Sequence, residues 1–227
     1  MSVLDYMKNK IEVLFQEYPY RFFTEHDIHT QLASLAIEYL RKNGDAVSET
    51  KDHIVVDGVH HEYAIPFRCD MTNYDFKVIP ETEFIRLHKE NPSFRAARGH
   101  IDLVVLNPDY VKSNDLVVVS GKRYDQVLAN LKNQKVPALD LAVEVVYHPT
   151  FDERPHQGIM QRRVDSTVQD YKKLIAIMGF KYPNGMPFCR EAAMMFFSNT
   201  EHVDALNSMF KSFPKKENVQ IITIIKH

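Results

Sequence analysis

The stretch that decides the fold is RAARGHIDLVVLNP, residues 95–108, in which a basic segment changes abruptly into an apolar one. The part at 99–106, GHIDLVVL, is apolar enough to be an internal strand that is buried on both faces. It nevertheless contains one acid, Asp102. Burying an unpaired carboxylate costs several kcal/mol. Asp102 therefore needs a basic partner, a solvent-exposed position at the strand end or a bound cation.

The composition is that of an ordinary globular protein. The chain has 227 residues, of which 44% are hydrophobic and 26% charged, and its net charge is -2. These values predict one domain, and any contact with nucleic acid must come from local basic patches. Only seven glycines occur, without a phosphate-binding motif, which argues against P-loop and dinucleotide-binding enzymes. The two cysteines, Cys69 and Cys189, lack the spacing of a zinc site.

The order of periodic segments predicts a mixed central sheet flanked by helices, an α/β fold within one domain spanning residues 1–227. A hairpin is expected from strands at 52–57 and 59–67, which would turn at Asp57-Gly58. Helices are expected at 2–17, 24–44, 81–90, 122–133, 161–178 and 201–213, and further strands at 99–106, 139–148, 190–198 and 218–226. No long apolar run or signal peptide is present, so we expect a cytoplasmic protein that does not enter a membrane.

A second acid lies inside an apolar strand. The segment LDLAVEVVYH, residues 139–148, places Glu144 on the same strand face as Val146 and His148. If this strand is next to the one with Asp102, the two carboxylates repel each other, and a shared divalent cation would remove that repulsion. The alternative is that each acid pairs with an arginine or lysine, or lies at a solvated strand end.

The order of these elements resembles the PD-(D/E)xK nuclease superfamily over roughly residues 24–178. It comprises an acid on a helix, a hairpin, GHID with its apolar run, a strand with an internal Glu, and a helix. The resemblance implies a restriction-endonuclease-like fold, with residues 179–227 as an extension, and suggests a homodimer. It also implies Mg²⁺ or Mn²⁺ held by Asp102 and Glu144. Glu25 would complete that site, because EHDIHTQL is similar to the opening helix of resolvase-like members.

The sequence departs from this family at one position. The family has a lysine two residues after the strand glutamate, where this chain has Val146. Either another cation replaces that lysine, with Lys172 the first candidate and His148 the local alternative, or the site is inactive.

Basic residues lie on both sides of the two acids in the sequence. Arg95 and Arg98 precede Asp102, and Arg162 and Arg163 follow Glu144. Positive charge beside a carboxylate metal site is what a phosphodiester substrate requires, so we expect nucleic acid, in particular DNA, as the partner.

The sequence allows three interpretations. The first is a Mg²⁺-dependent phosphodiesterase that acts on DNA, in which Glu62, beside His60, could also lie near the metal. The second is an inactive nuclease-fold protein that binds nucleic acid or a protein partner, which Val146 favours. The third is a histidine-based metallohydrolase using His26 and His29, but no HExxH motif or third ligand with suitable spacing supports it.

Overall fold

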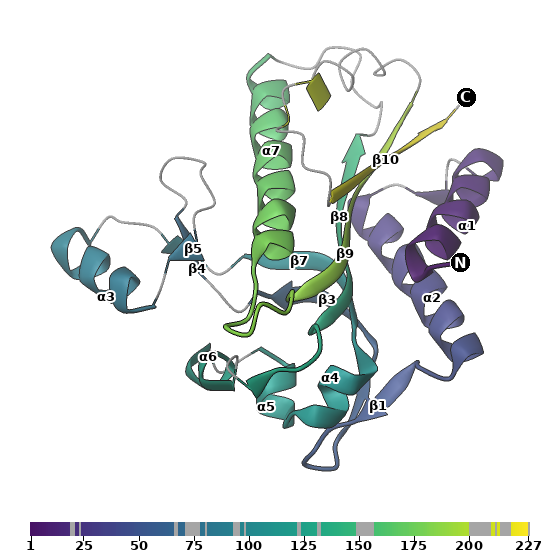
Figure 1. The fold of residues 1–227 in the computed structure, drawn as a ribbon. Coiled ribbons are helices and arrows are strands. Elements are labelled where there is room, and N and C mark those ends of the chain that lie inside the picture. Colours follow the sequence, from purple (N-terminus) through teal and green to yellow (C-terminus); the bar gives the residue numbers. More distant parts are fainter. Residues whose placement is uncertain are drawn as a thin grey trace.

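The structure is a computed structural model, drawn as a ribbon in Figure 1. The residues it describes are 1–18, 21–22, 24–65, 68–70, 78–79, 81–92, 96–97, 99–121, 124–130, 133–148, 157–199, 210–211, 213 and 219–226. All statements below concern these residues.

A five-stranded mixed sheet forms the centre of the fold. Its strands are β3 (Val59–Ala64), β7 (His100–Leu106), β8 (Leu139–His148), β9 (Cys189–Asn199) and β10 (Val219–Lys226). They lie in the order β10-β9-β8-β7-β3. β8, β9 and β10 run parallel, whereas β7 is antiparallel to both β8 and β3. The predicted α/β fold with a mixed central sheet is therefore confirmed.

Helices cover both faces of the sheet (Figure 1). Alternation along the strands produces two cores: Leu103 and Val143 belong to one, Val104 and Ala142 to the other. The first core is closed by α1 (Val3–Glu17) and α2 (Glu25–Asn43). The second is closed by α4 (Pro108–Ser113), α5 (Leu116–Val119), α6 (Tyr124–Asn130) and α7 (Gln157–Gly179).

Helix α2 begins and ends where the sequence predicts. The Thr24 hydroxyl accepts from the Asp27 N–H, and the Asp27 carboxylate accepts from the Thr24 N–H, which is a reciprocal capping box. At the other end Gly44 adopts φ 80°, a left-handed conformation that glycine tolerates best. The capping box makes Glu25 the first helical residue, which determines where its carboxylate points.

The predicted hairpin across Asp57-Gly58 is wrong. The strand before the glycine, β2 (Val55–Asp57), pairs with β1 (Val47–Glu49) in a separate two-stranded sheet. The strand after it, β3, pairs with β7. Gly58 donates to the Ala46 carbonyl and accepts from the Leu106 N–H, so the chain passes from one sheet to the other instead of turning back.

The remaining elements lie away from the central sheet. β4 (Arg68–Asp70), β5 (Val78–Ile79) and β6 (Ala96–Ala97) form a small sheet, which projects with α3 (Glu81–Glu90) to the left of Figure 1. The helix predicted at 201–213 falls almost entirely outside the described residues. Among the helices that the structure describes, none combines the length and apolarity needed to span a bilayer.

Candidate functional site between β7 and β8

The central sheet divides at the two acids. We call the point where β7 and β8 separate, at Asp102 and Glu144, the fork. The pairing of β7 with β8 ends at Leu103 and Val143, although β7 stays paired with β3 and β8 with β9 beyond this point. The next residues in register are Asp102 on β7 and Glu144 on β8. The expectation that the two acids lie on neighbouring strands is therefore confirmed, and they stand where those strands separate.

Carboxylates occupy the opening of the fork. The Val145 N–H of β8 donates to Asp102 Oδ2 at 2.8 Å, and the Tyr147 N–H donates to Glu25 Oε2 at 3.2 Å. These side-chain oxygens replace the backbone carbonyls that a continuing β7 would offer to β8. The Tyr147 hydroxyl also donates to the Phe22 carbonyl at 2.8 Å, which ties the segment before α2 to the same strand.

Glu144 is buried and paired with a lysine from α7. Glu144 is 1% exposed, and its Oε1 lies 2.7 Å from Lys173 Nζ. The same ammonium lies 3.2 Å from Asp170 Oδ1 and donates to the His100 carbonyl at 2.6 Å. Lys173 thus links α7 to both strands of the fork.

The charges around this lysine affect one another. Burial raises the pKa of Glu144 well above its usual value, although the Lys173 ammonium opposes the shift and Asp102 adds to it. Burial likewise raises the pKa of Asp170, again against the effect of Lys173. For Lys173 burial alone would lower the pKa, but the carboxylates of Glu144 and Asp170 outweigh it, so the pKa is raised. Lys173 therefore remains a cation at neutral pH.

Gly99, the glycine of the GHID motif, leaves room for this lysine. A Cβ at position 99 would lie 2.9 Å from Lys173 Cδ and 3.3 Å from Ile65 Cδ1. The first of these distances is shorter than a normal van der Waals contact between carbons. A side chain at this position would therefore displace the methylene chain of Lys173, whose ammonium group is held by several acceptors.

His29 approaches the fork from the opposite face. It lies on α2 one turn after Glu25, and its Nε2 is 3.6 Å from Asp102 Oδ2. Its ring stacks on that of His61, with ring centres 6.4 Å apart. Burial lowers the pKa of His29, although the Asp102 carboxylate acts in the other direction.

Glu62, which the sequence suggested as a neighbour of the metal, has an unusual backbone. Its φ is 50°, in the left-handed region that non-glycine residues seldom adopt. The β3–β7 register places it across from Asp102. Its charge affects the pKa values of both His29 and Asp170, which lie on the helices that flank the fork.

A polar pocket of about 290 Å³ opens at the fork. Its lining comes from α2, both strands and α7: Glu25, Asp102, Val145, Val146, Tyr147, Ser166, Thr167 and Asp170. Within the part of the chain that the structure describes, no three histidine, cysteine, aspartate or glutamate side chains group closely enough for a three-ligand metal site. Any ion here would therefore have at most two close protein ligands in this conformation.

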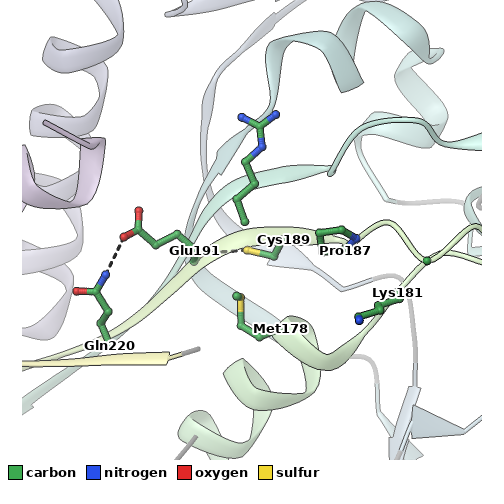
Figure 2. Close-up of a pocket in the computed structure, with 8 residues that line it drawn as sticks. Met178, Lys181, Pro187, Cys189, Glu191 and Gln220 are labelled. Atoms are coloured by element: carbon green, nitrogen blue, oxygen red, sulfur yellow. Dashed lines mark hydrogen bonds between the residues drawn. The ribbon is translucent and has the colours of Figure 1, made fainter. Parts of the chain in front are cut away.

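A second, larger pocket of about 720 Å³ lies at the start of β9 and β10 (Figure 2). Three of its polar side chains, Arg190, Glu191 and Gln220, have partners. Figure 2 shows the Glu191 and Gln220 side chains directed toward each other, at a hydrogen-bond distance of 2.8 Å. Arg190 pairs with Asp140, and burial raises the pKa of the Cys189 thiol to about 12, so it is not a reactive thiolate. The fork remains the stronger candidate.

The lysine of α7 that contacts Glu144 is the neighbour of the predicted one. The sequence predicted Lys172, whereas Lys173 contacts Glu144. The apolar stripe used for that prediction ran through Val164, Val168, Tyr171 and Ile175. The fully buried face instead contains Thr167, Tyr171, Leu174 and Ile177, with Asp170 and Lys173 beside it. A stripe placed one residue earlier would have identified Lys173.

The other predicted residues divide into two groups. Asp102, Glu144 and Glu25 meet at the fork, as described above. The His148 side chain and the side chains of Arg162 and Arg163 lie outside the described part of the chain, and so do Arg95 and Arg98. The nucleic-acid contacts expected of these arginines therefore stay predictions.

Comparison of the chain with protein-family models, curated proteins and solved structures found no match. The chemistry of the fork is thus the guide to function. The groups at or beside its polar pocket are four carboxylates, one buried ammonium and one buried imidazole. They belong to Glu25, Asp102, Glu144, Asp170, Lys173 and His29.

Proposed function

We propose that the protein is a divalent-metal-dependent phosphodiesterase of the PD-(D/E)xK type that acts on DNA, with the fork as its active site. The observation that carries this proposal is the ion pair between Lys173 and Glu144, next to Asp102. The family requires an ammonium group beside its two acids, and Val146 cannot supply one. Lys173 brings that group to the same acid from α7.

The residues at the fork fit a hard cation. Mg²⁺ prefers oxygen ligands and is usually bound by one or two carboxylates, with water and substrate phosphate completing its shell. Asp102 and Glu144 would hold the ion and Glu25 would approach it from α2, so a cage of three protein ligands is not required. When bound, such an ion polarises a phosphoryl oxygen and lowers the pKa of its water.

Each group of the chain then has a distinct role. Asp102 is held in place by the Val145 N–H, which restricts its free oxygen to a narrow range of directions. Lys173 opposes the rise in the Glu144 pKa that burial causes, and it would provide positive charge beside the reacting phosphate. The pocket, lined by Ser166, Thr167 and Asp170 on one side and Glu25 on the other, is where the phosphodiester would enter.

The test is cleavage of supercoiled plasmid and of labelled single- and double-stranded oligonucleotides by the full chain. We expect cleavage in millimolar Mg²⁺ or Mn²⁺ and none in EDTA. Asp102→Asn and Glu144→Gln should each reduce the rate at least about a hundredfold, because a metal contributes several kcal/mol to the transition state. The matched control is Asp109→Asn, the same change at an exposed residue of α4, which should cleave at the parent rate.

An inactive nuclease-fold protein is the second candidate, and one observation favours it. Lys173 is shared among Glu144, Asp170 and the His100 carbonyl, as expected of a lysine with a structural role. If the parent binds DNA in a gel-shift assay but cleaves none of the substrates with either metal, this second function replaces the first. Cleavage that persists in both acid variants would contradict the proposed active site.

A further inference from the structure

Strand β10 lies at one edge of the central sheet. Its neighbouring strand is β9, to which it runs parallel (Figure 1). Within the described part of the chain, one group outside β9 hydrogen-bonds to the β10 backbone: the side-chain amide of Gln16 on α1, which donates to the Ile225 carbonyl. A strand edge of this kind offers N–H and C=O groups to which another strand can bind.

The two edges of the central sheet differ in how they are protected. β3, at the other end of the strand order, contains His60, His61 and Glu62, and Glu62 has a φ of 50°. Charged side chains and backbone irregularities keep a strand edge from pairing with other chains. Residues 219–225 of β10 contain no charged residue, no proline and no positive φ. The β10 edge therefore has none of these devices.

The sequence of β10 is suited to pairing with itself. Residues 221–225 are IITII, which is the same in both directions. If two copies of β10 pair antiparallel about a two-fold axis at Thr223, Ile221 of one copy lies opposite Ile225 of the second, and Ile222 lies opposite Ile224. Opposite residues of an antiparallel pair share a face of the sheet. Each of these isoleucines then meets an isoleucine of the second copy, and the two Thr223 residues meet each other.

The exposure of these side chains agrees with such a pair. Ile221 is 38% exposed and Ile225, on the same face, is half-buried. A second copy would therefore remove apolar surface from water on this face. Ile222 and Ile224 lie on the other face and are already buried in the core closed by α1.

Charge also favours a second copy as the partner. Because residues 219–225 carry no charge, two β10 strands do not repel each other along this length. The same register places Lys226 of one copy opposite Gln220 of the second, and the Gln220 amide donates to Glu191. Residues of opposite charge from the two copies thus come together at each end of the strand pair.

We propose that the protein forms a homodimer in which the two β10 strands pair antiparallel about a two-fold axis at Thr223, so that the two central sheets become one. The same surface of each copy contacts its counterpart, as a two-fold dimer requires. Gln16 does not prevent this pairing, because a carbonyl oxygen can accept two hydrogen bonds. The dimer needs neither a metal nor DNA, so it is independent of the proposed activity.

The first test is sedimentation equilibrium of the full chain over a wide range of protein concentration, without metal or DNA. We expect a dimer of the parent protein. Thr223→Lys places two ammonium groups opposite each other at the axis, where like charges are destabilising. This change should weaken self-association at least about tenfold. The matched control is Thr30→Lys, the same change at an exposed residue of α2, which should associate like the parent.

A disulfide tests the register of the pair. The two Cα atoms at position 223 would lie about 4.5 to 5.5 Å apart, within the range of about 4.4 to 6.8 Å that a disulfide spans. Oxidised Thr223→Cys should therefore form a covalent dimer on a non-reducing gel. In Gln220→Cys, the matched control on the same strand, the two thiols would lie about 20 Å apart along the pair and should not link. The parent, run alongside, accounts for Cys69 and Cys189.

Each outcome bears on the proposal. A parent protein that is monomeric at every concentration would overturn it, and another molecule would then be the partner of the β10 edge. A dimer that Thr223→Lys leaves intact would mean that the interface lies elsewhere. Linkage through Gln220→Cys but not Thr223→Cys would rule out the axis at Thr223. If Thr223→Lys does not fold, the two cysteine variants decide the question, because their changes are small.

Discussion

At the scale of single residues, the Glu144 carboxylate determines where a lysine must lie. A carboxylate that is 1% exposed loses its hydration, and the nearby Asp102 makes its charge less favourable still. Lys173 compensates because its ammonium reaches Glu144 at 2.7 Å. Removing one member of such a pair is much more costly than removing both, since a buried unpaired charge remains.

We therefore expect Lys173→Met to destabilise the protein by about 3–5 kcal/mol, as is typical when one partner of a buried ion pair is removed. Combining it with Glu144→Leu should restore much of that loss, because no buried charge is then left. Urea unfolding of the two single variants and the double variant measures this coupling.

The matched control is the neighbouring lysine. Lys172 is only half-buried, so Lys172→Met should change the free energy of unfolding by less than about 1 kcal/mol. Equal losses from the two lysine variants would show that the pair with Glu144 contributes nothing special to stability.

At the scale of elements, the packing of α7 on the start of β7 depends on Gly99. The side chain of Lys173 crosses this position to reach the fork, and a Cβ there would lie 2.9 Å from its Cδ. The lysine cannot move aside freely, because its ammonium is held by Glu144, Asp170 and the His100 carbonyl.

Gly99→Ala should therefore cost about 1–3 kcal/mol of stability, the usual range for an overpacked position. Gly179→Ala is the matched control: Gly179 ends the same helix, and an added Cβ meets nothing within 4 Å. That change should be neutral or slightly stabilising. Chemical denaturation compares the two, and a harmless Gly99→Ala would argue against a close fit of Lys173.

At the scale of the whole molecule, the fork brings together ionisable side chains from both helix layers. Glu25 and His29 come from α2, whereas Asp170 and Lys173 come from α7. The two cores that hold these helices meet across the central sheet, so an ion bound at the fork would stabilise the folded chain as a unit.

We expect millimolar Mg²⁺ or Mn²⁺ to raise the melting temperature relative to EDTA. At a concentration of 100 times Kd the gain is about 2.7 kcal/mol, or roughly 5 to 10 °C for a domain of this size. Asp102→Asn should abolish this shift. Asparagine keeps an oxygen for the Val145 N–H, whereas alanine would leave that donor without its partner and lower stability even without metal. A parent protein with the same melting temperature in all three solutions would refute the site.

Local patterns determined much of the fold. The capping box at Thr24 and Asp27 and the left-handed Gly44 act over a few residues, so the limits of α2 could be read directly. The apolar runs of β7 and β8 were long enough to identify both strands, and two acids inside them pointed to chemistry. The Asp57-Gly58 hairpin failed because its turn signal was local, whereas the partners of β2 and β3 lie in different sheets.

The tertiary structure decided which groups meet those acids. Lys173 and Lys172 are adjacent in the sequence, and only the rotation of α7 against the sheet determines which one faces Glu144. The fork, the capping of β8 by Glu25 and the approach of His29 to Asp102 depend in the same way on where helices pack. The sequence by itself determined the elements and the two strand acids, because periodicity and capping are local. The partners of those acids were decided only by folding, because Lys173 and His29 come from α7 and α2, two helices that pack on opposite faces of the sheet.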